Sequence, residues 1–301
     1  MINQRFRDQV DLLLEVLGPC LHDERLALKG GTAINLFYQD MPRLSVDIDL
    51  TYVCLNERTE FIKELREIFE AFQTKLKQFF PEVNRTSDGI PKQLRLSNRT
   101  AQIKIDVNLV LRGTVYPTEE RLLCQRAQDE FQKMVKVRCV SFEDIYAGKF
   151  CAALDRQHPR DLYDVRGFFE KFTFTEKLKK AFLVYLISGN RPISEMIHPT
   201  LLDQRSLYDR EFVGMSYHDV SYADLEQARM QLIQVIDDVL TPDDHRFLLS
   251  FKEGAPLWDL LGIKEAHAFP GIKWKLQNIK KMDPHKHRLA IDGLKRKLKI
   301  D

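Results

Sequence analysis

KGGTAINLFYQDMPRLSVDIDL, residues 29–50, is the stretch that decides the fold. It opens with two glycines and a threonine, and it closes with Asp47 and Asp49 inside an apolar frame. In a strand, residues i and i+2 point to the same face, so both carboxylates would aim at one spot. Two carboxylates at such a short distance repel one another unless a cation lies between them. Mg²⁺ is the cation we expect, because it prefers hard oxygen ligands and keeps positions open for water and phosphates.

The turn Gly30-Gly31-Thr32 precedes an apolar segment of helical character. Its backbone N–H groups and its hydroxyl suit a phosphate. Alone, such a turn is most often a helix cap, and Asp-Ile-Asp is often an edge strand with a solvated face. Their order in one strand–turn–helix–loop–strand unit favours the functional interpretation, which is nucleotide chemistry.

Length and composition set the broad class. The chain has 301 residues, of which 44% are hydrophobic and 30% charged, values typical of soluble globular proteins with one large or two moderate domains. We expect no membrane span, because no run of about 18 apolar residues exists. The start, MINQRFRDQVDLLLEVLG, predicts an amphipathic helix and not a signal peptide. The five cysteines are scattered, which favours reduced thiols in a cytoplasmic protein.

The charge is uneven along the chain. Net charge is only +2, but residues 273–301 carry ten Lys or Arg against three Asp or Glu. A basic segment of this kind can contact phosphate backbones, although a solvated helix face is the simpler explanation for the segment alone.

Hydrophobic periodicity predicts the order of elements in the first part of the chain. The segment AQIKIDVNLVL, residues 101–111, places Asp106 on the face opposite its apolar residues, where it can be a third carboxylate. Without Asp47 and Asp49, an ordinary solvated residue would be an equally good explanation of Asp106. The predicted helices are 6–17 (ended by Gly18 and Pro19), 32–38 and 57–80, and the predicted strands are 26–28, 46–53, 93–96 and 101–111.

Residues 114–117 are the predicted boundary between a domain of residues 1–116 and a mainly helical domain of residues 117–301. In the second domain, Ser141 and Pro159 begin helices. Polar charges on these two consecutive helices could converge on a cleft, although surface ion pairs are commoner for any one pair. These charges are Lys149, Arg160, Asp161 and Asp164.

The residues in these motifs carry a family resemblance. The turn at 30–32, Asp47-Ile48-Asp49 and the later Asp106 resemble the nucleotidyltransferase superfold of DNA polymerase beta. The fuller pattern KGGTAINLF, RLSVDIDL, QIKIDV, DIYAGKFCAALDR and PRDLYDV resembles the AbiEii/AbiGii toxin family of bacterial toxin–antitoxin and phage-defence loci, over residues 28–169. The resemblance implies an α+β protein with an N-terminal mixed sheet flanked by helices and a mainly helical C-terminal domain.

The resemblance also implies roles in the first domain. Gly31 and Thr32 would bind the triphosphate of a nucleoside triphosphate, and Asp47 and Asp49 would hold Mg²⁺. Asp106 would fill the third acidic position, as a metal ligand or a proton acceptor.

In the second domain, the resemblance implies that Lys149 contacts the phosphates and that Asp161 or Asp164 completes the late acidic motif. The full nucleotide-binding set is then Lys29, Gly30, Gly31, Thr32, Arg43 and Arg160.

The implied activity is addition of nucleotides to the 3′ acceptor end of transfer RNA by a cytoplasmic toxin, which would block aminoacylation and translation. A cognate antitoxin is the implied protein partner. Two alternatives stay open: nucleotidyl or phosphoryl transfer to a protein hydroxyl, and a non-catalytic nucleotide-binding or toxin-neutralising partner.

Overall fold

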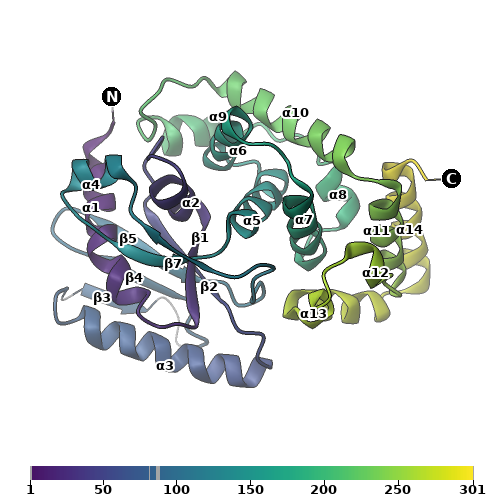
Figure 1. Cartoon of the computed structure of the whole chain (residues 1–301), viewed down its shortest axis with the longest axis horizontal. Coiled ribbons are helices and arrows are strands. Elements are labelled where there is room, and N and C mark those ends of the chain that lie inside the picture. Colours follow the sequence, from purple (N-terminus) through teal and green to yellow (C-terminus); the bar gives the residue numbers. More distant parts are fainter. Residues whose placement is uncertain (1, 81, 86–88, 301) are drawn as a thin grey trace. The chain divides into compact units, whose positions relative to one another are not determined.

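The computed structural model describes residues 2–80, 82–85 and 89–300. The chain forms two compact units (Figure 1). The first comprises Met1–Ile145 and Phe212–Asp219, and the second comprises Tyr146–Glu211 and Val220–Asp301. Within the described residues, no helix is both long and apolar enough to cross a membrane. The α+β class expected from the sequence is confirmed.

A mixed sheet forms the centre of the first unit. Its strand order among the described residues is β3-β4-β5-β2-β1-β7-β6. Strand β2 runs antiparallel to β1 and parallel to β5, so the strand with the two aspartates is internal. The strands are β1 Leu26–Lys29, β2 Asp47–Tyr52, β3 Glu82–Arg85, β4 Gln93–Ser97, β5 Gln102–Val107, β6 Glu119–Leu122 and β7 Lys136–Cys139.

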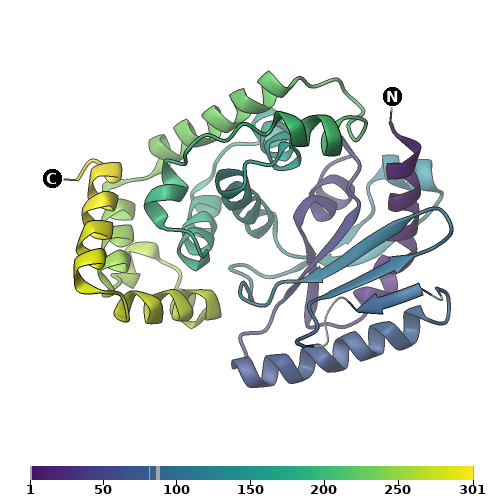
Figure 2. The ribbon, with the colours of Figure 1, turned by 180° about the vertical axis from the view of Figure 1, so that it is seen from behind.

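One face of this sheet is a hydrophobic core. Ile48, Leu50 and Ile105 are fully buried on it, as strict apolar alternation requires. Helix α1 contacts β2 and β5, and Phe61 of α3 packs its ring 4.9 Å from Tyr52, so these two helices cover that face (Figure 2). The helices of this unit are α1 Gln4–Cys20, α2 Gly30–Ala33, the π-helix Ile34–Tyr38, α3 Arg58–Leu76 and α4 Gln125–Phe131, and α5 Phe142–Asp155 begins in it.

Helix α1 does not end at Gly18 and Pro19, as the sequence predicted, but continues through both to Cys20. Proline removes one hydrogen bond, the one to the carbonyl four residues earlier. That carbonyl belongs to Glu15, an exposed residue, so water can satisfy it. Cys20 is fully buried, and its packing holds the last turn in the helix.

Strand β5 ends at Val107 and not at Leu111, because Asn108 turns the chain. The Asn108 side-chain oxygen accepts hydrogen bonds from the backbone N–H groups of Val110 and Leu111, both at 2.9 Å. Such local side-chain acceptors compete with the strand ladder and start a turn.

The predicted boundary at residues 114–117 falls inside the first unit. Strands β6 and β7 follow it and extend the same sheet, with β7 parallel to β1. Asp144, at the start of α5, accepts hydrogen bonds from the backbone N–H groups of Val115 and Tyr116 at 2.8 and 3.0 Å. These bonds fix the segment to the first unit, and the units divide at Ile145 and Tyr146 instead.

In the described residues of the second unit, the regular secondary structure is helical. Its core includes Tyr146, Phe150 and Phe168, with Phe168 ring centroids 4.8 and 5.0 Å from the other two. After α5, its helices are α6 Pro159–Lys171, α7 Glu176–Ser188, α8 Ile193–Ile197, α9 Arg205–Leu207, the π-helix Tyr208–Phe212, α10 Tyr222–Val239, α11 Pro242–Glu253, α12 Trp258–Leu261, the 3-10 helix Ala266–Ala268, α13 Pro270–Lys280 and α14 Pro284–Leu298.

Candidate functional site

The glycine turn and the strand with the two aspartates meet closely. Gly30 has φ +71°, in the left-handed region that favours glycine. A Cβ atom on Gly30 would lie 2.5 Å from Oδ2 of Asp49, so the Asp49 carboxylate lies directly against the turn. Helix α2 starts at Gly30 and continues into the π-helix at Ile34. The turn, the helix start and one carboxylate therefore form one local site.

Thr32 connects the helix to the strand. Its hydroxyl is 2.5 Å from the Asp47 carbonyl oxygen and 3.0 Å from the Ser45 hydroxyl, and the residue is almost fully buried. Thr32 therefore fixes the start of β2 beside the turn. The hydroxyl is thus bonded within the protein, and its predicted contact with phosphate stays a prediction.

Arg43 lies behind the turn and is 2% exposed. A Cβ atom on Gly31 would lie 2.8 Å from Nη2 of Arg43 and 3.0 Å from the Ser45 hydroxyl oxygen. The guanidinium also donates to the Leu44 carbonyl at 2.8 Å. Arg43 thus lies against the backbone of the turn, and its expected part in nucleotide binding stays a prediction.

Asp47 and Asp49 occupy the sheet face opposite the core. Both are half-buried, whereas the intervening Ile48 is fully buried. Across the sheet, Asp49 is the register partner of Lys29 on β1 and of Asp106 on β5. Burial lowers the pKa of Lys29, and the charges of Asp49 and Asp106 oppose that shift. The three predicted acidic residues therefore share one face with a half-buried lysine.

A divalent cation fits the pair on β2. Mg²⁺ is commonly bound by one or two carboxylates together with substrate phosphates, and less often by a complete set of protein ligands. Asp47 and Asp49 supply such a pair, and the Asp49 carboxylate lies against the Gly30 turn. Within residues 2–80, 82–85 and 89–300, no three His, Cys, Asp or Glu side chains form a group able to hold a metal. The predicted three-carboxylate metal set is therefore not assembled in the structure.

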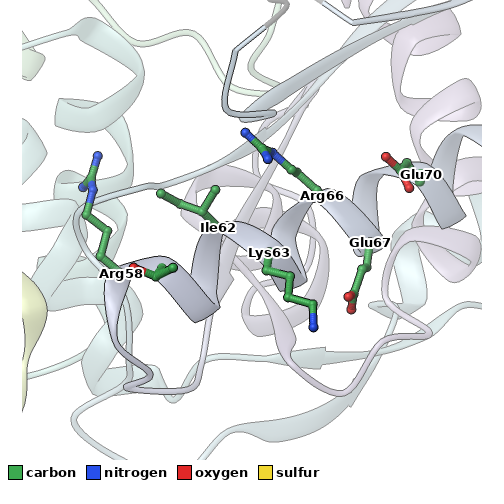
Figure 3. A pocket seen from close by; sticks show the side chains of 7 residues that line it. Arg58, Ile62, Lys63, Arg66, Glu67 and Glu70 are labelled. Atoms are coloured by element: carbon green, nitrogen blue, oxygen red, sulfur yellow. The ribbon is translucent and has the colours of Figure 1, made fainter.

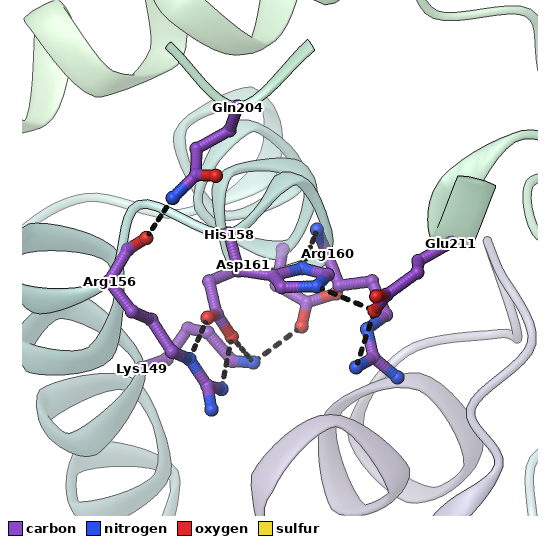
Figure 4. Close-up of polar contacts among 8 residues, drawn as sticks. Lys149, Arg156, His158, Arg160, Asp161, Gln204 and Glu211 are labelled. Carbon is purple, nitrogen blue, oxygen red and sulfur yellow. Dashed lines mark hydrogen bonds and ion pairs between the residues drawn. The ribbon is translucent and has the colours of Figure 1, made fainter. Parts of the chain in front are cut away.

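A second polar cluster lies in the helical unit, on α5 and α6 (Figure 4). Lys149 Nζ lies 2.7 Å from Asp161 Oδ1 and 2.8 Å from Asp164 Oδ2, with all three residues buried. Arg156 donates to Asp161 from Nε at 2.6 Å, although its own side chain is 64% exposed. Burial alone would raise the pKa of Asp161, but the charges of Lys149 and Arg156 outweigh it and hold the pKa well below its usual range. The structure therefore brings Lys149, Asp161 and Asp164 together in one buried ion-pair cluster.

Arg160 stands apart from that cluster. Its Nη2 is 3.8 Å from Glu211 Oε2, and His158 Nε2 lies 3.1 Å from the same oxygen (Figure 4). His158 Nδ1 accepts the backbone N–H of Arg160 at 3.1 Å and caps α6. Arg160 therefore belongs to the start of this helix, next to Glu211.

The basic segment forms helices α13 and α14. Most of its Lys and Arg side chains are exposed, and Trp274 beside them is 46% exposed. Lys275 differs, because its ammonium donates to the Arg191 carbonyl at 2.8 Å and burial lowers its pKa to about 8. The exposed basic residues are Lys273, Lys280, Lys281, Lys286, Arg288, Arg296, Lys297 and Lys299.

A surface hollow of about 500 Å³ lies along α3 (Figure 3). It is lined by charged side chains of that helix, including Arg58, Lys63 and Arg66, together with Ile62. None of the predicted site residues lines it, so we do not assign the site to this hollow.

Sequence reasoning missed several residues that shape these clusters. Ser45 lies two residues before Asp47, so strand alternation could have placed it on the same face. Alternation places Lys104 on the face of Asp106, but it does not show that the two side chains pair. Arg156 gives no such signal, because a break at His158 and Pro159 separates it from Asp161.

The structure thus sets a glycine turn against Asp49 on an internal strand of a mixed sheet, with Asp47 on the same strand. A family model described as "Nucleotidyl transferase AbiEii toxin, Type IV TA system" matches residues 11–278. The chain therefore belongs to this family and is a nucleotidyltransferase toxin of the type IV toxin–antitoxin class. The family description implies a nucleoside triphosphate substrate and an antitoxin partner.

The fold has a counterpart among solved structures. MenT4, a nucleotidyltransferase toxin from Mycobacterium tuberculosis H37Rv, matches with a TM-score of 0.58 and 15% sequence identity. The match covers 92% of this chain and 95% of that chain. At this identity the match shows a shared fold. The comparison with curated protein sequences gave no significant match.

Proposed function

We propose that this toxin uses Mg²⁺ and a nucleoside triphosphate to add nucleotides to the 3′ acceptor end of transfer RNA. Such an addition would block aminoacylation and stop translation. The observation that carries the proposal is the contact between the Gly30 turn and Asp49, which joins a phosphate cradle and a carboxylate in one site.

The reaction requires a deprotonated hydroxyl, an in-line approach to the α-phosphate and neutralisation of the leaving pyrophosphate. A bound Mg²⁺ supplies charge neutralisation and lowers the pKa of the attacking hydroxyl. Asp47 and Asp49 would hold that cation. The N–H groups at Gly30 and Gly31 would orient the triphosphate, and Thr32 would hold the strand and the turn in register.

Lys149 and its two carboxylates remain a proposed phosphate site in the helical unit. An ammonium has three N–H donors, and Asp161 and Asp164 account for two of them. The third could go to a phosphate oxygen without breaking either ion pair. We propose Asp161 as the late acidic residue that orients Lys149, because Arg156 also holds its carboxylate in place.

The exposed lysines and arginines of α13 and α14 support an RNA acceptor. A protein that neutralises phosphates with such side chains binds more weakly as salt rises. Trp274, half-exposed among them, offers an aromatic face on which an unpaired base could stack. We further propose that the toxin acts in the cytoplasm, in a phage-defence locus, and that its antitoxin restrains it there.

The acceptor is identified by a labelling experiment. The protein is incubated with each α-³²P-labelled nucleoside triphosphate, Mg²⁺ and total transfer RNA, and the products are separated. We expect label in a transfer-RNA band. Label only in protein would favour transfer to a protein hydroxyl, and growth arrest by an Asp47→Ala variant without any label would favour a binding role.

A further inference from the structure

The carboxylate of Asp106 is held at both of its oxygens by residues of its own sheet. Lys104 Nζ lies 2.5 Å from Oδ2, and Gln93 Nε2 donates to Oδ1 at 2.7 Å. Gln93 is the register partner of Asp106 on β4, and Lys104 precedes Asp106 by two residues on the same face. Local strand geometry therefore fixes where this carboxylate points.

The same lysine stands next to the proposed cation site. Lys104 is the register partner of Asp47 on β2. Burial alone would lower the pKa of Lys104, but the pKa is raised, first by its hydrogen bond to Asp106 and also by the charges of Asp47 and Asp49. Its ammonium is thus a tethered positive charge within electrostatic reach of all three carboxylates.

We propose that Lys104 is a positioning residue that keeps Asp106 out of the coordination shell of a divalent cation at Asp47 and Asp49. The inference rests on the proposed use of a divalent cation by this site. Each Asp106 oxygen already accepts a hydrogen bond, and a divalent ion moving toward Asp106 would approach the Lys104 ammonium. Like charges repel one another, so the ammonium disfavours a cation at Asp106.

The consequence is a site with two protein carboxylates for its cation. Such a site binds the free cation weakly and gains its remaining ligands from the phosphates of a nucleoside triphosphate. Asp106, held in place by Lys104 and Gln93, would then lie outside the coordination shell of the cation.

Mn²⁺ binding tests this without any transfer reaction. Free Mn²⁺ is measured by electron paramagnetic resonance during titration of the full chain in the absence of nucleotide. We expect Asp106→Asn to change the Mn²⁺ affinity by less than about threefold, because its carboxylate is not a ligand. We expect Lys104→Met to tighten binding by about tenfold, because it removes a charge and releases a carboxylate.

Two more variants complete the design. Lys104→Arg keeps the charge and should bind Mn²⁺ as the wild type does. The double variant Lys104→Met with Asp106→Asn should lose most of the increase in Mn²⁺ affinity that Lys104→Met alone produces. If Lys104→Met does not fold, Lys104→Gln takes its place, with thermal unfolding as the check.

The proposal is overturned if Asp106→Asn weakens Mn²⁺ binding by about tenfold or more. It is equally overturned if the Lys104 variants that lack the charge bind Mn²⁺ no more tightly than the wild type does. Undetectable Mn²⁺ binding by both the variant and the wild type would count as this result. The Mn²⁺ titrations and the transfer-RNA labelling can fail independently. If the variants bind Mn²⁺ as expected but no transfer RNA is labelled, the proposed acceptor is wrong and the role of Lys104 is retained.

Discussion

Oδ2 of Asp49 lies 2.5 Å from the point where a Cβ atom on Gly30 would be. The carboxylate and the turn are thus mutually dependent: the turn needs a residue without a side chain, and the carboxylate occupies the space so left. This relationship links the proposed phosphate-binding turn and the acidic strand within one unit of the fold.

Gly30→Ala should abolish transfer. The added methyl group meets the Asp49 carboxylate, and φ +71° is strained for alanine. We expect a loss of about 1–3 kcal/mol in the free energy of unfolding, together with displacement of the carboxylate. Thermal unfolding and nucleotide incorporation measure the two effects.

Gly18→Ala is the matched control, because a Cβ atom there meets nothing within 4 Å and the residue lies in α1. Alanine should leave transfer unchanged and stabilise the helix by up to about 1 kcal/mol. Equal activity of the two variants would refute the close contact at Gly30.

Thr32→Val should destabilise the protein, because it removes the buried hydroxyl that joins Asp47 and Ser45. A lost buried hydrogen bond of this kind costs about 1–3 kcal/mol. Thr32→Ser keeps the hydroxyl and should stay close to wild type in denaturant unfolding. A Thr32→Val variant with wild-type stability but weakened binding of the nucleoside triphosphate would instead assign the hydroxyl a direct contact with phosphate.

Asp161 should contribute stability that is lost in acid. Its pKa is depressed in the folded protein by Lys149 and Arg156, so the folded state binds fewer protons than the unfolded state at low pH. The contribution is therefore fully present above the usual carboxyl pKa of about 4 and declines as the pH falls below it. Asp161→Asn should cost about 3–5 kcal/mol near pH 7, since Lys149 loses a buried partner.

Urea unfolding across pH tests this prediction. The difference between wild type and Asp161→Asn should be constant near neutral pH and shrink below about pH 4. Asp155→Asn is the control, because its ion pair with Arg191 is exposed and should be worth at most about 1 kcal/mol. A difference that grows toward acid would contradict the assigned sign.

The parts of the fold that depend on strand alternation could be predicted. Apolar residues at 48, 50, 103 and 105 placed Asp47, Asp49 and Asp106 on one face, and the sheet register aligns Asp49 with Asp106. Gly30 marked the turn correctly, because its φ of +71° lies in the left-handed region that favours glycine.

Other features depended on tertiary contacts that no local pattern records. The packing of the buried Cys20 keeps α1 helical beyond Pro19. Asp144 fixes residues 115 and 116 to the first unit by two hydrogen bonds. The partners of Asp106 also escaped prediction: Lys104 and Gln93 were visible as strand residues, but a sequence does not say which way a charged side chain turns.

The most direct test of the central claim is the rate of nucleotide incorporation into transfer RNA by Asp49→Asn, which preserves the shape of the side chain. Asp129→Asn, an exposed carboxylate on α4, serves as the control. We predict a loss of about a hundredfold or more for Asp49→Asn, wild-type rates for the control, and no incorporation by the wild type in excess chelator. Wild-type rates for Asp49→Asn, or full activity in chelator, would contradict the account.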